Sequence, residues 1–492
     1  MQQPDTSPSS STPVPPSSTD SVPVAPSRAA TQAGARTGPH RIVIVGGGAG
    51  GLELATKLGD RLGRRGLADI LLVDANPTHL WKPLLHEVAA GTLNSYQDEL
   101  SYLAHARQHG YGFHFGRMTG LDRDNREIIL APVTADDGRV IVSERRLSYD
   151  ILVLAVGSVS NDFGTPGAAE NCRFLDSRAQ AEALHRDLLA LLAVTLGQER
   201  PSNGGRDRAA TEPAPRIGVA IIGGGATGVE LAAELRRAVE DFSHYAEPIH
   251  KDILHISIIE MAPRLLPPLP EKLAASVTEA LGKLNIEILT NAKVARIDPS
   301  KVELADGRSV PAQIRVWAAG IKAPDFLRGL GGLENFRTGQ LMVRSTLQTT
   351  LDDDIFAFGD CAYCPAAPQG HPNSDRAVPA RAQAAHQQSD LLAGALIKRI
   401  EAIHAGRTPP PYPLYTYSDF GSLVSLSRYT ALGTLMGGVF RKSHMIEGWF
   451  ARLAYISLYR MHQMALHGIW RTGLLIITNR LQRMTQPSLK MH

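Results

Sequence analysis

The feature that most constrains this chain is a glycine-rich turn that occurs twice. Residues 41–58 read RIVIVGGGAGGLELATKL, and residues 217–235 read IGVAIIGGGATGVELAAEL. In each copy an apolar run meets three glycines, and apolar residues at helical spacing follow. A strand, a glycine turn and a helix in this order are typical of a dinucleotide-binding unit.

The glycines of each copy follow the spacing Gly-x-Gly-x-x-Gly, in which each glycine has its own role. The first permits the tight turn, the second lets the backbone approach a pyrophosphate, and the third lets helix and strand pack closely. The helix N-terminus offers free N–H groups and a partial positive charge to that anion. The candidate residues are Gly46, Gly48 and Gly51 in the first copy, and Gly223, Gly225 and Gly228 in the second.

Each copy also carries an acid where its next strand is predicted to end. Asp74 ends the strand ILLVD in the first copy, where a carboxylate can bind ribose hydroxyls. Glu260 ends ILHISIIE in the second, later than the usual spacing of roughly 20 residues. The excess fits a long helix followed by SHYAEPIHKD. A carboxylate at Glu260 would repel a 2′-phosphate and favours NADH over NADPH, although Arg264 lies nearby.

The order of the remaining segments also repeats. Polar, turn-rich strands follow each acid, and the apolar strands YDILVLAVGS and IRVWAAG close the two copies at Gly157 and Gly320. This repetition predicts an α/β chain with two Rossmann-like dinucleotide-binding domains of the disulfide-reductase type. The predicted divisions are 1–40, 41–175 (first domain, first part), 176–325 (second domain), 326–434 (first domain, second part) and 435–492 (an amphipathic helical tail).

Composition limits the other possibilities. Residues 1–40 contain no Leu, Ile, Phe, Trp or Tyr, so they predict a disordered tail, with a transit peptide as the weaker alternative. A net charge of +3 gives no case for nucleic acid. Cys172, Cys361 and Cys364 cannot make a disulfide framework, which suggests a reducing compartment. The sequence contains no run of about 18 apolar residues, so it predicts no membrane-spanning helix.

Further stretches resemble one family in combination. They are HLWKPLLHEVAAGTL (79–93), AVGSVSNDFGTPG (155–167), WAAGIKAP (317–324), FAFGDCA (356–362) and ARAQAAHQQ (380–388). With the two glycine motifs they are similar to type II NADH:quinone oxidoreductases, single-subunit, non-pumping flavoenzymes of respiratory membranes. The resemblance covers about residues 41–492, and ISLYRMHQMALHGIWRTGL (456–474) is similar to the proteobacterial branch.

The resemblance implies FAD in the first unit and NADH in the second. Asp360, preceded by Gly359, matches the acid that holds the ribityl chain, although such a pair also suits a plain turn. Lys82 and Pro83 match a loop near the flavin ring, and otherwise read as a surface loop. With Gly157 these complete the candidate FAD residues. Ala319 and Gly320 match the small residues that let the nicotinamide approach, or a tight strand end.

The resemblance also implies the quinone and proton sites. Gln383 and Gln387 lie four apart on one helical face and match the quinone motif, the alternative being a polar helix face. The helix carrying them is predicted to start near 378–380. Glu230 matches a glutamate proposed to relay protons, the alternative being a first-turn acid. Many family members carry lysine near Phe420, and its role cannot be carried over here.

The implied reaction is NADH + H⁺ + quinone → NAD⁺ + quinol, with ubiquinone or menaquinone as acceptor. The implied location is the cytoplasmic face of a bacterial inner membrane, bound peripherally, with a homodimer possible. Two alternatives stay open. One is a sulfide:quinone reductase, which shares the fold but needs no intact nicotinamide site. The other is a non-catalytic flavoprotein that senses redox state.

The C-terminal stretch 441–492 favours a membrane surface. It holds one acid, Glu447, against the basic residues Arg441, Lys442, Arg452, Arg460, Arg471, Arg480, Arg483 and Lys490. At about 100° per residue, one side carries Arg452, Arg460, Gln463 and His467. The other side carries Phe450, Ala454, Leu458, Met461, Ala465 and Ile469, continued by Leu474, Ile477, Leu481 and Met484. A basic amphipathic helix suits a lipid surface; the alternative is packing on the body or in a dimer seam.

Cys361-x-x-Cys364 could in principle be a redox dithiol or a metal pair. Disulfide reductases of the related fold carry their cysteine pair on the helix after the first glycine turn, and here that helix has none. Two isolated ligands do not close a zinc site. We therefore expect no metal site, and favour inert residues packed near the flavin.

Overall fold

The computed structural model describes residues 39–135, 137–197, 216–243, 253–437 and 440–483. Residues 40–492 form one compact unit, and everything below concerns that unit. The predicted disordered tail lies outside the described residues except at its end, where His40 already belongs to the first strand.

The first glycine turn belongs to a six-stranded sheet with the order β22-β23-β11-β1-β2-β5. All neighbours are parallel except β22 and β23. The core residues of β1 and β11 are buried and apolar, as expected for parallel strands covered on both faces. The strands are β1 (His40–Val45), β2 (Ala68–Asp74), β5 (Gly112–Phe115), β11 (Ile151–Leu154), β22 (Gln348–Thr349) and β23 (Asp352–Ala357).

The second glycine turn belongs to a four-stranded parallel sheet with the order β15-β14-β13-β19. Strands β5-β2-β1-β11 of the first sheet have the same order, so the predicted repeat is confirmed as a repeat of topology. The strands are β13 (Ile217–Ile222), β14 (Leu254–Ile259), β15 (Ile286–Leu289) and β19 (Ile314–Trp317).

Each copy carries a small antiparallel sheet and a helix after its glycine turn. The small sheets are β6 (Met118–Asp122), β7 (Glu127–Leu130) and β10 (Arg145–Ser148), and β16 (Val294–Ile297), β17 (Lys301–Leu304) and β18 (Ser309–Pro311). The helices are α1 (Ala49–Arg61) and α7 (Ala226–Phe242), with α4 (Tyr102–His109) and α8 (Glu271–Lys283) following the second strands. Strand β23 returns to the first sheet after the second copy ends, so this sheet is built from two separate parts of the chain.

Further elements connect these units. They are β3 (Thr78–His79), α2 (Leu85–Ala90), α3 (Ser95–Asp98), β4 (Leu100–Ser101), β8 (Val133–Thr134), β9 (Val140–Val142), β12 (Val159–Ser160), α5 (Ala168–Asn171), α6 (Arg178–Gly197), β20 (Ile321–Lys322), β21 (Leu341–Met342) and β24 (Ala362–Tyr363). Single 3-10 turns are η2 (Gly63–Arg65), η3 (Lys82–Leu84), η5 (Asp325–Leu327), η6 (Leu330–Gly332) and η7 (Gly359–Cys361). Strand β12 pairs with β20, which joins the ends of the two copies.

The C-terminal part differs from its prediction in two places. Helix α9 (Ala382–His404) begins after residues 378–380, because Arg381 has extended backbone and serves as the N-cap. The tail does not start as a helix at residue 435. Instead β25 (Gly421–Leu426), β26 (Thr430–Gly437) and β27 (Phe440–Glu447) form an antiparallel sheet, and α10 (Trp449–Arg483) follows Gly448, whose φ of 66° suits a sharp turn out of the strand.

Candidate functional site

The first glycine loop has the geometry that its spacing predicts. Gly46 has a φ of 103°, and a Cβ there would lie 2.5 Å from the carbonyl oxygen of Ala155, the residue that follows the neighbouring strand β11. A Cβ on Gly51 would lie 1.9 Å from the Gly46 oxygen. A Cβ on Gly48 would meet no atom within 4 Å, so open space lies in front of the start of α1. That space fits a pyrophosphate approaching the helix N-terminus.

Asp74 stands at the end of β2 and is tied to the same loop. One carboxylate oxygen, Oδ2, accepts the backbone N–H of Gly47 at 2.7 Å, and Oδ1 accepts that of Asn76 at 2.7 Å. Burial raises the pKa of Asp74, and these hydrogen bonds oppose the rise. A carboxylate held in this way keeps further lone pairs for donors such as ribose hydroxyls.

The second loop repeats this geometry. Gly223 has a φ of 113°, and a Cβ on Gly228 would lie 2.0 Å from its carbonyl oxygen, whereas a Cβ on Gly225 would meet no atom within 4 Å. Glu260 Oε2 accepts the N–H of Gly224 at 2.7 Å, as Asp74 does in the first copy. The longer interval before Glu260 therefore leaves the acid at the equivalent place.

Arg264, near the second acid, is engaged elsewhere. Its guanidinium donates to the carbonyl oxygens of Leu266 at 3.2 Å and Pro267 at 2.8 Å. Glu260 meanwhile accepts a second backbone N–H, that of Ala262, at 2.7 Å. The Glu260 carboxylate therefore faces the glycine loop, whereas the Arg264 guanidinium is hydrogen-bonded to backbone carbonyls of its own segment.

Three of the segments predicted to bind FAD meet at Ser158. Lys82, the first residue of η3, donates from Nζ to the Ser158 carbonyl at 2.9 Å. The Ser158 hydroxyl donates to Asp360 Oδ2 at 2.7 Å. Gly157 and Gly359, the residues before Ser158 and Asp360, have φ of 72° and 73°. Pro83 follows Lys82 inside η3.

Two residues at this junction were not singled out from the sequence. Asp176 binds Lys82 Nζ at 3.2 Å and the backbone N–H of Ser160 at 3.0 Å. Gln388 accepts the N–H of Gly359 at 2.9 Å and is fully buried. Gln388 ends the stretch ARAQAAHQQ. The only sequence signal that could have pointed to Gln388 was its position close to the two candidate glutamines of that stretch.

The candidate nicotinamide residues end the last strand of the second sheet. Ala319 packs against the apolar cluster around Trp317, whose indole N–H donates to the carbonyl oxygen of Asn161. Gly320 has a φ of 84°, and a Cβ there would lie 2.6 Å from the ring of Phe163. The exposed ring of Phe163 thus lies against the place at which the nicotinamide is predicted to approach.

Glu230 lies in α7 and is 8% exposed. Its Oε1 accepts the N–H of Ser425 at 3.0 Å, and His86 Nδ1 lies 3.8 Å from its Oε2. Burial raises the pKa of Glu230 to about 8, with smaller contributions from the carboxylates of Glu87 and Glu234. Burial also lowers the pKa of His86 to about 4. Both groups are therefore largely uncharged at neutral pH, and they do not form an ion pair.

Gln383 and Gln387 lie on one side of α9 as predicted, but both amide groups hold one segment, residues 415–421. Gln383 Nε2 donates to the Tyr417 hydroxyl at 3.0 Å and to the Gly421 carbonyl at 3.2 Å. Gln387 Nε2 donates to the Ser418 carbonyl at 2.7 Å, and its Oε1 accepts the N–H of the same residue. Direct contact of these two glutamines with quinone remains a prediction. The sequence did not predict that they would bind residues 415–421.

The cysteines lie in the core. Cys172, Cys361 and Cys364 are free and buried. Burial raises the pKa of both Cys361 and Cys364 to about 12, so neither carries a thiolate at neutral pH. Cys361 donates to the backbone carbonyls of Leu154 and Phe358. Within the described parts of the chain, no group of three or more His, Cys, Asp or Glu is placed to hold a metal ion.

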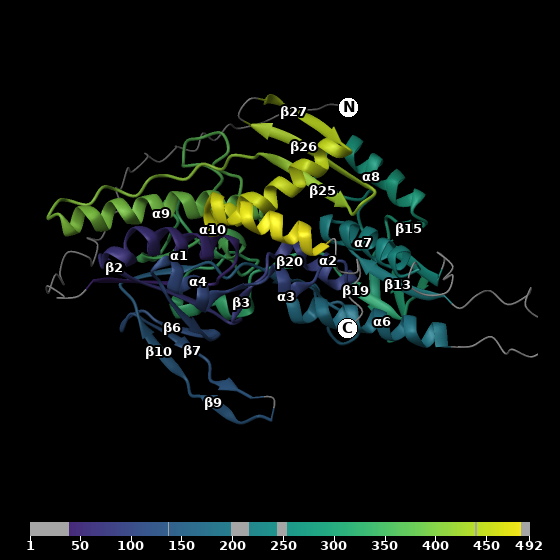
Figure 1. The fold of residues 1–492 in the computed structure, drawn as a ribbon, viewed down its shortest axis with the longest axis horizontal. Coiled ribbons are helices and arrows are strands. Elements are labelled where there is room, and N and C mark those ends of the chain that lie inside the picture. The colour runs from purple at the N-terminus through teal and green to yellow at the C-terminus, as the bar shows by residue number, and fades with distance from the viewer. Residues whose placement is uncertain (1–38, 136, 198–215, 244–252, 438–439, 484–492) are drawn as a thin grey trace, which may run out of the picture. The chain divides into compact units, whose positions relative to one another are not determined.

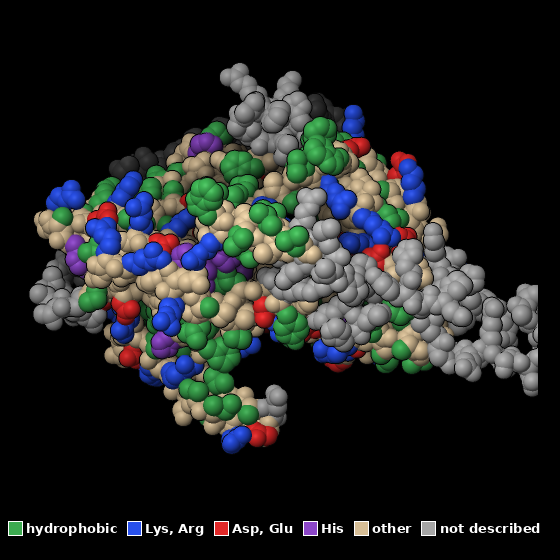
Figure 2. All heavy atoms as spheres, in the orientation of Figure 1, with side chains coloured by type: hydrophobic (Ala, Val, Ile, Leu, Met, Phe, Trp, Pro, Cys, Tyr) green, Lys and Arg blue, Asp and Glu red, His purple; other side chains and the backbone are tan. Residues whose placement is uncertain are grey.

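Helix α10 buries a mixed set of apolar and polar residues against the body and leaves several large apolar and aromatic side chains exposed. Ala451, His462, Gln463, Leu466 and Thr472 are buried against the body. Phe450, Ile469 and Trp470 are 70%, 75% and 92% exposed, and Figure 2 shows hydrophobic side chains at the surface over this region. Gly468 kinks the helix into two segments with φ 76° and ψ 168° (Figure 1). The alternative that the predicted apolar stripe packs on the body is therefore wrong for Phe450 and Ile469, which belong to that stripe.

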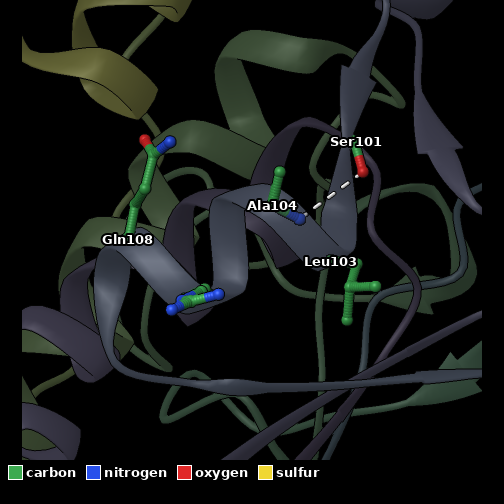
Figure 3. A pocket seen from close by; sticks show the side chains of 5 residues that line it. Ser101, Leu103, Ala104 and Gln108 are labelled. Carbon is green, nitrogen blue, oxygen red and sulfur yellow. Dashed lines mark hydrogen bonds between the residues drawn. The ribbon is translucent and has the colours of Figure 1, made fainter.

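A hollow of ≈ 640 Å³ lies on the outer side of α4, lined by Ser101, Leu103, Ala104, Arg107 and Gln108 (Figure 3). The Ser101 hydroxyl caps the helix by accepting the Ala104 N–H at 3.4 Å. Gln108 accepts a hydrogen bond from Arg471 of α10 at 2.6 Å. None of the candidate nucleotide residues lines this hollow.

Comparisons with known proteins agree with this architecture. Residues 40–389 match the family model described as pyridine nucleotide-disulphide oxidoreductase. The chain is 44% identical over 454 residues to a type II NADH:quinone oxidoreductase of Haemophilus influenzae, covering 92% of this chain and 99% of that protein. It is 28% identical over 415 residues to a protein of the same name from Mycobacterium tuberculosis, covering 80% of each.

Two solved structures show the same fold. The structure of NDH2 from Plasmodium falciparum in complex with NADH has a TM-score of 0.73 at 17% identity and covers 92% of this chain and 99% of that one. The sulfide:quinone oxidoreductase of Aquifex aeolicus has a TM-score of 0.64 at 18% identity, covering 87% and 92%. At these identities the likeness concerns the fold alone. The matched family model and the Haemophilus relative together show that the chain belongs to the pyridine nucleotide-disulphide oxidoreductase family and, within it, to the type II NADH:quinone oxidoreductases.

Proposed function

We propose that this chain oxidises NADH and reduces a membrane quinone, with FAD as the resident cofactor: NADH + H⁺ + quinone → NAD⁺ + quinol. The observation that carries the proposal is the pair of glycine loops, each open in front of its helix and each tied to an acid at the next strand end. Family membership assigns this pair to one reaction rather than to two unrelated sites.

The chain's own residues supply binding and orientation. FAD, once bound, would accept hydride from NADH and pass two electrons to quinone. The N-termini of α1 and α7 would face the two pyrophosphates, and Asp74 and Glu260 the riboses. The contacts joining Lys82, Ser158 and Asp360 fix three loop segments relative to one another, which such a site needs because transfer requires the two rings within roughly 3–3.5 Å.

Glu230 is proposed to hold the proton that quinone reduction consumes. Its Oε1 is occupied by the Ser425 N–H, so the proton resides on Oε2, on the side of neutral His86. The nearby hydroxyl of Tyr455 on α10 is buried without a hydrogen-bond partner in the described parts of the chain, and its charge interactions with Glu230 and Glu234 place it beside them. A water or a quinone oxygen could bind between them.

We expect Glu230→Gln to slow quinone-dependent turnover by about 100-fold or more, the usual contribution of general acid catalysis. In the native chain the quinone step should slow as pH rises through about 8, because the carboxyl then loses its proton. The glutamine variant should lack that pH dependence and keep NADH-driven flavin reduction. If the native chain and the glutamine variant had the same pH–rate profile, the proposed proton-holding role of Glu230 would be contradicted.

Nucleotide preference gives a second expected result. The Glu260 carboxylate would repel the 2′-phosphate of NADPH, and Arg264 is bound to backbone carbonyls instead of compensating. We expect kcat/KM for NADH to exceed that for NADPH by at least about tenfold, or ~1.4 kcal/mol. Glu260→Gln should reduce this ratio, and comparable values for the two nucleotides in the native chain would contradict it.

The outer face of α10 is proposed to bind a lipid surface, where the quinone resides. Exposed Trp449 and Trp470 and exposed Arg452 and Arg471 combine aromatic anchors with positive charge. Each such cation contributes about 1 kcal/mol near anionic lipid. Among the described residues, no helix is long and apolar enough to cross a membrane. The cytoplasmic side and a homodimer are carried over from the resemblance as part of this proposal.

One experiment tests the reaction as a whole. The purified chain should be yellow, NADH should bleach it without air, and a soluble ubiquinone analogue should restore the colour. Bleaching by sulfide instead of NADH would favour the sulfide:quinone reductase alternative. A yellow protein that neither donor bleaches would favour a non-catalytic flavoprotein, and a chain that takes up no flavin would overturn the proposal.

A further inference from the structure

Two buried histidines from distant parts of the chain meet beside the first glycine loop. His79 ends β3 and is 7% exposed, and His462 lies in α10 and is 2% exposed. Their Nε2 atoms are 3.0 Å apart, the distance of a hydrogen bond between the rings. The first segment belongs to the stretch 79–93 and the second to the stretch 456–474.

The direction of this hydrogen bond follows from its surroundings. His79 Nδ1 lies 2.9 Å from the carbonyl oxygen of Gly47, which can only accept, so Nδ1 carries the hydrogen. Burial lowers the pKa of His79 to about 4, so the ring is neutral at ordinary pH and its Nε2 is bare. His462 must therefore donate from Nε2. Its own Nδ1 has no hydrogen-bond partner in the part of the chain that the structure describes.

Gly47 is the residue between the first two glycines of the loop. Its carbonyl accepts from His79 and also from the Tyr102 hydroxyl, at 2.7 Å. Because a trans peptide is planar, the Gly47 carbonyl and the Gly48 N–H point in opposite directions. Two donors on the carbonyl thus fix the direction of the Gly48 N–H. A Cβ on Gly48 itself would meet no atom within 4 Å, so there is room for an anion next to this peptide.

The rest of α10 holds His462 in place. The His462 ring stacks on Trp81, with ring centroids 5.6 Å apart and an angle of 15° between the planes. Trp81 also stacks on Tyr459, one helical turn earlier, at 5.2 Å and 23°. Trp81 directly precedes η3 and its residue Lys82, so α10 contacts both the pyrophosphate loop and the segment predicted to lie near the flavin ring.

We propose that His462 is a positioning residue for FAD: it acts through His79 to fix the Gly47–Gly48 peptide, and so makes tight flavin binding depend on docked α10. The inference rests on the proposed FAD site. It gives the inner face of α10 a role separate from the outer face that would contact lipid.

The test compares two substitutions in the full-length chain. His462→Gln keeps an N–H that can reach His79, whereas His462→Met has similar length and no donor. FAD affinity is measured by removing the flavin and titrating it back while following flavin fluorescence, without turnover. We expect His462→Met to bind FAD about tenfold more weakly, the effect of one lost hydrogen bond, and His462→Gln to stay within about threefold of the native chain.

Two further variants distinguish a positioning role of His462 from a role in packing alone. Leu466→Met alters the same buried face of α10 without touching His79, and should leave FAD affinity unchanged. His79→Met removes the donor to Gly47 and should weaken FAD binding about as much as His462→Met. It also tests the proposal if the His462→Met variant does not fold. In a His79→Met background, His462→Met should add little, because both changes break one chain of hydrogen bonds.

Three results would overturn the inference: native FAD affinity in His462→Met, equal weakening by His462→Gln and His462→Met, or full additivity of His462→Met with His79→Met. Failure of the proposed function looks different, since the native chain itself would then take up no FAD. If the native chain binds FAD and the His462 variants bind it equally well, only the role of His462 is ruled out and the proposed function stands.

Discussion

Replacing Gly225 by alanine is expected to cripple NADH binding while leaving the fold and the flavin in place. A Cβ at Gly225 would meet no atom within 4 Å, and its φ of −74° is ordinary for alanine, so the chain is not strained. The methyl group would fill the space in which the NADH pyrophosphate is proposed to lie. The loss of one hydrogen bond to a charged group, at about 1.5–3 kcal/mol, raises KM for NADH by about 10- to 150-fold.

Gly48→Ala is the matched change in the first loop and should have the complementary effect. Gly48 has a φ of −64° and the same open surroundings, so this variant should fold but lose FAD. Gly394→Ala in α9, where a Cβ also meets nothing, is the control and should change neither affinity. Flavin content and the NADH dependence of flavin bleaching measure both effects. Normal FAD and NADH affinities in both loop variants would show that neither loop binds a pyrophosphate.

Substituting three outward residues of α10 should release the protein from lipid vesicles. Phe450→Glu, Ile469→Glu and Trp470→Glu together replace large side chains that are 70%, 75% and 92% exposed. Each apolar side chain that leaves lipid forfeits about 1.5–3 kcal/mol, and each added acid meets an anionic surface. We expect vesicle binding to fall at least about 100-fold, measured by co-sedimentation with vesicles containing anionic lipid.

The control is Val140→Glu with Ile141→Glu on β9, which are 55% and 64% exposed but lie outside α10. This variant should bind vesicles as the native chain does. The α10 variant should keep its turnover with a soluble quinone analogue, because its inner face is unchanged. If it stays bound to vesicles but changes from dimer to monomer, the outer face of α10 is a seam between two copies instead of a lipid-binding surface.

Local sequence was sufficient to predict the two glycine turns because each turn and the helix that follows it are built from residues a few positions apart. Gly46 needs a positive φ, and Gly51 must leave room for the Gly46 carbonyl. The acids Asp74 and Glu260 lie where the strand pattern places them, and the longer interval before Glu260 changes only the connection. The tail was harder to predict, because a strand such as β27 depends on pairing with β26 and not on its own periodicity.

Contacts between distant segments could not be predicted in this way. The spacing of Gln383 and Gln387 predicted one helical face, but not that both amides would hold residues 415–421. Ser158 belongs to a recognised stretch, yet only the folded chain shows that it joins Lys82 to Asp360. Each of these contacts requires a loop closure that no local pattern specifies.

By itself, the sequence determined two dinucleotide-binding units, their order, their acids and an amphipathic C-terminal helix, since periodicity and turn chemistry act between near neighbours. Which face of that helix is buried became clear only from the folded chain. The same holds for the hydrogen bonds by which His462 contacts His79 and His79 contacts the Gly47 carbonyl. A helical stripe is equally compatible with facing the body or facing outward. The choice depends on the surface that the helix meets, and here aromatic rings and hydrogen-bond acceptors line that surface.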